Sequence, residues 1–197
     1  MPPRRRTRRL WLAAVAFVVA AGVTFGLVWF QPWKLFIDHR VDEQLPQVAI
    51  ESPAAVDSTV APSPSVTAPS SPSASSRPTA ALLSRGTLIS HEHPTSGTVS
   101  VVRQPDGSRV LAIANLDTSD GPDVHVWLTD APVLKGDKGW HVFDDGQHIS
   151  LGTLKANLGN QVYRIPKGAD LTRLTSVSIW CERFDVSFGA AQLKPAA

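Results

Sequence analysis

Cysteine and methionine are nearly absent from this chain of 197 residues, and their scarcity excludes several kinds of site. The single cysteine, Cys181, excludes an intramolecular disulfide, a four-cysteine zinc site and the Cys-x-x-Cys motifs of dithiol oxidoreductases and c-type haem proteins. The one methionine is Met1, so a folded domain has no methionine to ligate haem iron or copper. Glycine-rich nucleotide-binding motifs and the Gly-x-Ser-x-Gly motif of hydrolases are also missing. A hydrolase or a nucleotide-dependent enzyme is therefore disfavoured.

Basic residues are scarce except at the N-terminus. Five arginines stand within the first nine residues, whereas the chain from Ala81 onward has 11 Lys and Arg against 12 Asp and Glu. A nucleic-acid-binding domain carries a basic face, and this nearly neutral C-terminal half has too few basic residues for one. Nucleic acid is therefore excluded as the expected partner.

A long uncharged run occupies residues 10–30. Its 21 residues match the roughly 20 that an α-helix needs to span a bilayer. The arginines before it favour a cytoplasmic N-terminus, and Trp11 and Trp29 suit the two membrane interfaces. We expect a single-pass protein of the cell membrane, with residues 1–9 cytoplasmic and the C-terminal domain extracellular. Cleavage of the run as a signal peptide stays open as an alternative.

Residues 31–81 separate this run from the next apolar region. Residues 31–50 have mixed charges and predict a short amphipathic juxtamembrane helix. Residues 51–80 are rich in Pro, Ser and Ala and have almost no aliphatic bulk, so burial cannot offset the entropy lost on ordering. Their prolines favour an extended chain of about 3.1 Å per residue. We expect a disordered linker that holds the following domain away from the bilayer.

Residues 82–194 consist of short apolar runs separated by turn signals. No stretch keeps a helical period, whereas residues 98–102 and 109–114 flank Pro105-Asp106-Gly107 as a hairpin would. Further strands are expected at 124–128, 149–151, 161–165, 176–180 and 184–188. The pattern predicts an all-β domain, an antiparallel β-sandwich or a barrel-like fold.

The alternation of apolar residues changes phase after Cys181. Val177, Ile179 and Cys181 share one parity, whereas Phe184 and Val186 share the other. Because strand side chains alternate with a period of two, residues 182–183 must contain a β-bulge or a break between two strands.

Five segments of this region carry recognisable motifs: residues 96–99 (SGTV), 121–128 (GPDVHVWL), 151–155 (LGTLK), 159–166 (GNQVYRIP) and 177–190 (VSIWCERFDVSFGA). In this order and spacing they resemble the DM13 domain, and the resemblance covers roughly residues 82–194. DM13 domains occur beside DOMON domains in animal proteins and alone on bacterial membrane anchors. The resemblance implies a role in electron transfer in which the cysteine of the Trp-Cys motif, here Cys181, is redox-active. Because the chain has no DOMON domain, its redox partner would be a separate protein.

Cys181 has three interpretations from the residues alone. Its parity with Val177 and Ile179 favours a small side chain packed in the core, because free cysteine is among the most buried residue types. The alternatives are a redox-active thiol, consistent with an unpaired cysteine in an oxidising compartment, and a metal ligand. No cofactor-binding motif is visible, so the cofactor and the question of catalysis stay open.

Other residues suggest a metal site or a binding surface. His91 and His93 would lie on one face of a strand and form a metal-binding pair. His125 and Trp127 alternate with apolar neighbours and would be presented on a surface, with Asp123 and Trp180 as further binding candidates. These residues support an alternative function, a non-catalytic module that binds a cell-wall component or serves in adhesion.

Overall fold

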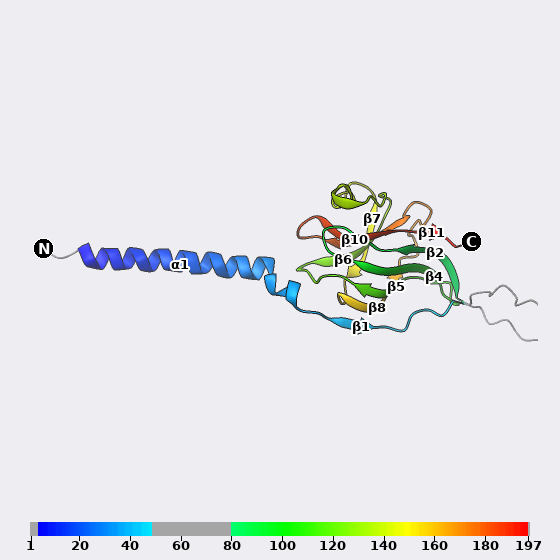
Figure 1. The fold of residues 1–197 in the computed structure, drawn as a ribbon, viewed down its shortest axis with the longest axis horizontal. Coiled ribbons are helices and arrows are strands. Elements are labelled where there is room, and N and C mark those ends of the chain that lie inside the picture. Colours follow the sequence, from blue (N-terminus) through cyan, green and yellow to red (C-terminus); the bar gives the residue numbers. More distant parts are fainter. Residues whose placement is uncertain (1–3, 49–79, 197) are drawn as a thin grey trace, which may run out of the picture.

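The computed structural model describes residues 4–48 and 80–196, which form one long helix and a β-domain (Figure 1). Helix α1 (Arg4–Phe30) contains the predicted membrane span. Within it, Arg8–Phe30 is long and apolar enough to cross a membrane, and none of its most apolar window is buried by the rest of the chain. The apolar surface of this window is therefore free of protein contacts that bury it, as expected for a helix in contact with lipid.

A short 3-10 helix, η1 (Pro32–Phe36), follows α1. It lies at the start of residues 31–50, where the sequence predicts a short amphipathic helix. Gln31 takes a left-handed conformation with φ 45°, and Pro32 cannot donate the backbone hydrogen bond that would continue the preceding helix. The chain therefore turns at this point and runs along the domain.

In the part of the chain that the structure describes, eleven strands build two sheets, which confirms the predicted all-β class. The six-stranded sheet has the order β1-β8-β5-β4-β2-β11, and the five-stranded sheet has the order β3-β10-β9-β6-β7. All pairs are antiparallel except β1 with β8. The strands are β1 (Arg40–Asp42), β2 (Ala81–Thr87), β3 (Ile89–Ser90), β4 (Ser96–Arg103), β5 (Arg109–Asp117), β6 (Val124–Thr129), β7 (His148–Thr153), β8 (Leu158–Ile165), β9 (Ser176–Cys181), β10 (Val186–Gln192) and β11 (Lys194–Pro195).

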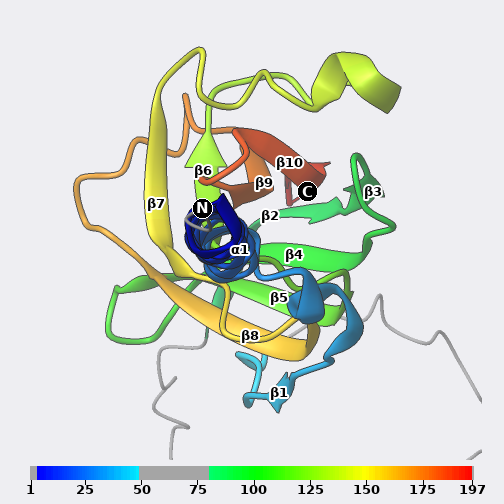
Figure 2. The same cartoon turned by 90° about the vertical axis from the view of Figure 1, so that its left-hand side faces the viewer.

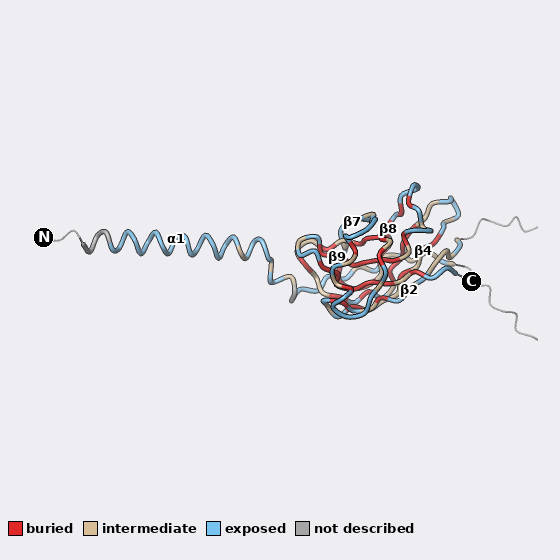
Figure 3. Tube along the Cα trace, turned by 90° about the horizontal axis from the view of Figure 1, so that it is seen from above, coloured by how far each residue is buried: buried red, intermediate tan, exposed pale blue. Residues whose placement is uncertain are grey.

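The main core lies between the two sheets and takes side chains from both of them. Figure 3 shows the buried stretches of the chain in this region. The predicted hairpin is confirmed: β4 and β5 are paired along their length, and Arg103 and Arg109 form the pair next to the turn. Burial of each branched apolar side chain is worth about 1.5–3 kcal/mol, so this layer supplies the main driving force for folding. Its central members include Val99, Val101, Leu111, Ile113, Val126, Leu128, Val177, Ile179 and Cys181.

A second, smaller core covers the outer face of the five-stranded sheet. It contains Trp127, Phe143, Trp180 and two alanines. Residues 130–147, which include the 3-10 helix η2 (Gly136–Gly139), leave the end of β6 and return to β7 beside this face (Figure 2). The aromatic side chains on this face are therefore buried rather than presented to solvent.

Residues 38–48 form a strap along the edge of the six-stranded sheet. Within the strap, β1 pairs in parallel with β8, and Val48 forms an isolated bridge with Ala80. Gly159 has φ 102°, and any Cβ there would collide with the Val41 carbonyl, so glycine is required where the strap crosses β8. Part of the segment expected between helix and domain is thus a strand of the domain. The predicted disordered linker at 51–80 lies outside the described residues except for Ala80.

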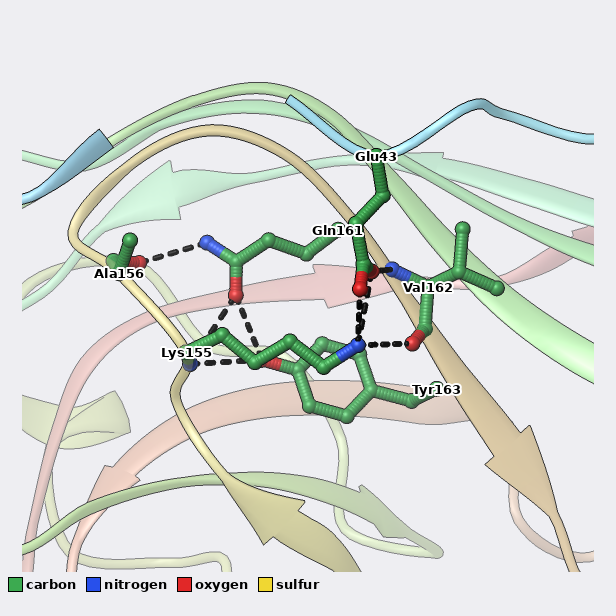
Figure 4. A network of polar contacts seen from close by, with 6 residues as sticks. All are labelled: Glu43, Lys155, Ala156, Gln161, Val162 and Tyr163. Carbon is green, nitrogen blue, oxygen red and sulfur yellow. Dashed lines mark hydrogen bonds and ion pairs between the residues drawn. The ribbon is translucent and has the colours of Figure 1, made fainter. Parts of the chain in front are cut away.

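Polar contacts hold the strap in place (Figure 4). Glu43 accepts two hydrogen bonds of 2.7 Å from the Lys155 ammonium and one of 2.7 Å from the Val162 amide. The bond from Lys155 is the main reason that the pKa of Glu43 lies below its ordinary value. Beneath this pair, the Tyr163 hydroxyl donates to Gln161 at 2.6 Å, and burial raises the pKa of Tyr163 to about 12.

Candidate functional site

Cys181 is the last residue of β9 and lies in the core between the two sheets. It pairs with Val124 of β6 on one side and with Val186 of β10 on the other, and its side chain is fully buried. The phase change predicted after it is a break between strands, because residues 182–185 form the turn of the β9–β10 hairpin. Asp185 closes this turn in the left-handed conformation with φ 50°.

Burial keeps the Cys181 thiol protonated. Loss of solvent around the sulfur raises the pKa of Cys181, and this effect outweighs the backbone N–H groups of Phe184, Arg183 and Asp123, which favour the thiolate. A nucleophilic cysteine needs the opposite balance, a lowered pKa and an open approach. The environment therefore fits a packed thiol and does not fit a thiolate that exchanges disulfides.

We expect alkylation of Cys181 in the native protein to be orders of magnitude slower than in denaturant, with its pH midpoint above the ordinary value of about 8.5. Because the pKa of Cys181 is raised in the folded state, the contribution of this group to stability is fully present below the ordinary thiol value. This contribution is lost as the pH rises through the folded pKa, because the thiol of the unfolded chain ionises at lower pH. Iodoacetamide labelling followed by mass spectrometry measures the rate. Lys138→Cys in a Cys181→Ala background supplies an exposed control thiol; equal native rates for the two thiols would contradict the prediction.

An aromatic stack begins at the residue before Cys181 and ends at the surface. Trp180 stacks on Trp127 with ring centroids 5.1 Å apart, and Trp127 stacks on His148 at 3.9 Å with an interplanar angle of 4°. The two indoles are only 1% and 5% exposed, whereas His148 is exposed. Trp127 and Trp180 are thus not the surface aromatics that the binding-module alternative expected, because β7 and residues 130–147 cover them.

Asp123, His125 and Glu182 converge on the same face of the five-stranded sheet. Nε2 of His125 lies 3.1 Å from Asp123 Oδ1, and Nδ1 lies 3.5 Å from Glu182 Oε1. The indole N–H of Trp127 also donates to Glu182 Oε1 at 3.3 Å. One ligand atom from each of the three lies within 4.8 Å of the others, a set of one nitrogen and two oxygens that could hold a divalent metal ion.

The sequence suggested Asp123 and His125 as binding residues but missed Glu182. Asp123, His125 and Trp127 are spaced by two and so share a strand face. Glu182 stands two residues after Trp180 and continues the parity of that residue past the end of β9. The two-residue spacing that places each side chain on this face was therefore present in the sequence. The pairing of β6 with β9 is needed to bring the two segments together.

The metal pair expected at His91 and His93 is absent from the described residues. Strand β3 ends at Ser90, so the alternation that would align the two imidazoles does not continue. His91 is buried, with Nδ1 2.9 Å from the Ser187 hydroxyl and Nε2 2.9 Å from the Leu134 carbonyl, which occupies both ring nitrogens. His93 packs edge-on against Phe188 at 4.1 Å and contacts Glu92.

A family model described as electron transfer DM13 matches residues 87–193, more than half of the chain and nearly all of the β-domain. No curated protein and no solved structure matches the chain. The chain therefore belongs to the DM13 family, as its motifs predicted.

Proposed function

We propose, from its membership of the DM13 electron-transfer family, that this chain is a membrane-anchored one-electron carrier. In this proposal Cys181 is the buried redox group, and the stacked rings of Trp180, Trp127 and His148 connect it to the surface. The stack is the observation that carries the proposal, because it leads without a gap from the neighbour of the thiol to an exposed side chain.

Two-electron thiol chemistry suits this site poorly. A mixed disulfide or a sulfenic acid requires the sulfur to meet a second molecule, but Cys181 is fully buried and the chain has no second cysteine to resolve such a product. Its raised pKa also lowers the fraction of reactive thiolate. Transfer of one electron through the adjacent rings needs no approach to the sulfur.

The proposed oxidation is balanced as follows. The Cys181 thiol loses one electron, releases its proton to the solvent and becomes a thiyl radical. The electron passes through Trp180 and Trp127 to an oxidised partner, a separate redox protein that docks beside His148 and is reduced by one electron. A reduced redox protein then returns one electron to the thiyl radical, and uptake of one proton from the solvent restores the thiol.

The proposed location is the outer face of the cell membrane. The arginines at the start of α1, before its apolar run, favour a cytoplasmic N-terminus, which leaves the domain outside and anchored by a single span. The electron partner would then be another protein of the cell envelope.

Flash oxidation of the full chain in detergent tests the route. A water-soluble photo-oxidant generates tryptophan radicals, and transient absorbance follows their decay. We expect the tryptophan radicals to decay several-fold faster in the wild-type protein than in Cys181→Ala, because the thiol donates an electron to the oxidised indole. Trp127→Phe should lower the yield of the Cys181-dependent phase.

Trp11→Phe is the matched control, because Trp11 lies in α1 far from the stack and its loss should leave the Cys181-dependent phase unchanged. Identical decay in the wild-type protein and in Cys181→Ala would overturn the proposed route.

A further inference from the structure

The end of α1 and the β9–β10 turn are in direct contact. The rings of Phe30 and Phe184 stack with centroids 5.9 Å apart and an interplanar angle of 8°. The Arg183 guanidinium lies 4.9 Å from the centre of the Trp29 ring and donates to the Trp29 carbonyl. Carbonyls in the last turn of a helix have no partner within the helix, so this bond satisfies one of them. The turn is therefore held at the end of the apolar span.

The bilayer determines the depth of this contact. Arg8–Phe30 has 23 residues, and its length of about 34 Å at 1.5 Å per residue slightly exceeds the roughly 30 Å of the hydrocarbon core. Phe30 therefore lies at the boundary between the acyl chains and the headgroups. Each headgroup layer is about 5–8 Å thick. Because the Phe184 ring is 5.9 Å from the Phe30 ring, it lies at the depth of this layer.

Phe184 is one of few large apolar side chains on the surface of the domain. Its exposed fraction is 42%, and within residues 80–196 the only other exposed one is Leu134, at 39%. Trp29 and Trp33 beside the turn are also exposed. Tryptophan is enriched where water meets lipid, because its ring is apolar and its N–H is polar. Exposed aromatic rings thus gather at the end of the domain that faces the span (Figure 1).

The basic groups near the turn already have partners. Lys34 donates to the Gly121 carbonyl at 3.0 Å and lies 4.0 Å from Asp120, and Arg183 is bound to Trp29. Neither is a free cation for an anionic headgroup. Contact with lipid would therefore depend on the aromatic side chains and would not require anionic lipid.

The long segment at 49–79 does not separate the domain from the bilayer. The chain enters the domain before this segment, where β1 pairs with β8. Val48 then forms a bridge with Ala80, so the two ends of the segment are held side by side on the domain. The length of the segment therefore does not set the distance between the domain and the membrane.

We infer that the domain rests on the lipid surface, with Phe184 of the β9–β10 turn among the headgroups of the leaflet where α1 ends. The partner is the lipid itself, and the contact continues the apolar surface of the span. Cys181 directly precedes this turn, so the proposed redox residue lies at the membrane end of the domain. The inference rests on the membrane anchoring in the proposed function and adds the position of the domain on the bilayer.

Photocrosslinking of the full chain in phosphatidylcholine vesicles tests the inference. p-Benzoylphenylalanine, which keeps an aromatic ring, replaces Phe184, Leu134 or Val18 in three separate variants. Leu134 is the matched control, because its exposure is close to that of Phe184, and Val18 reports on the middle of the span. Mass spectrometry of the peptides detects lipid adducts. We expect adducts at positions 18 and 184, with several-fold more at 184 than at 134.

The three positions separate the possible failures. Adducts at position 18 without adducts at position 184 would overturn the inference and leave the membrane anchor standing. Equal yields at positions 184 and 134 would also overturn it, because contact would then not be specific to the turn. A lack of adducts at position 18 would overturn the anchor and the inference together. The flash experiment in detergent is independent, because the Cys181-dependent decay does not require a bilayer.

Discussion

Replacement of Trp180 by alanine is expected to lower the free energy of unfolding by about 3–5 kcal/mol, as other buried tryptophan truncations do. Trp180 is only 1% exposed, stacks on Trp127 and meets the ring of Phe143 edge-on at 6.2 Å. The cavity left behind would lie under residues 130–147, which cover this face. Because small domains are stable by only about 5–15 kcal/mol, the alanine variant should lose a large part of its stability. Urea unfolding of the full chain in detergent, followed by circular dichroism, measures the loss.

Trp180→Phe separates the electron-transfer role of this residue from its packing role. Phenylalanine keeps an aromatic ring against Trp127 and should cost less stability than alanine. A phenyl ring is much harder to oxidise than an indole, so the Cys181-dependent decay of the flash experiment should slow several-fold in a folded protein. A folded Trp180→Phe protein with the decay of the wild type would show that the electron does not pass through this ring.

The all-β fold was predictable from the sequence because its signals are local. The period-two runs at β4, β5, β6, β8 and β9 mark strands, and Pro105-Asp106-Gly107 marks the β4–β5 turn. Strand β1 gave no comparable signal. It has three residues and pairs with Leu158–Asn160, more than 100 positions away, in a parallel register that no local turn specifies. Such pairing depends on the assembled edge of β8.

The candidate site was predictable only in part. Parity placed Cys181 among inward-facing residues, and its complete burial agrees with this. Parity also placed Trp127 on the other face, but the sequence could not show that residues 130–147 fold back over that face and bury it. The contact at the helix end was not foreseen, because it forms only when the β9–β10 turn meets the end of α1.

Cutting the chain between the strap and β2 is expected to leave the domain on the membrane at neutral pH. A protease site inserted between Ala61 and Pro62 is cleaved from outside in intact spheroplasts, and the domain fragment is then followed by sedimentation. If residues 31–81 only tethered the domain, one cut would release it. Instead, the fragment should remain bound through β1 and β8, the Glu43–Lys155 pair and the contacts of Arg183 and Phe184 with the end of α1.

Acid should increase the release of the cleaved fragment. Hydrogen bonding from Lys155 lowers the pKa of Glu43, so its contribution is present above the ordinary glutamate value of about 4.3 and is lost as the pH falls through the lower bound value. Glu43→Gln removes the charge and should increase release at neutral pH, although a partly exposed pair contributes only up to about 1 kcal/mol. Asp42→Asn is the matched control, because Asp42 is exposed and its carboxylate pairs only with Arg40, at 3.8 Å, among the described ion pairs. Full release of the wild-type fragment at neutral pH would show that the strap does not hold the domain, and resistance of the inserted site to external protease would contradict the proposed orientation.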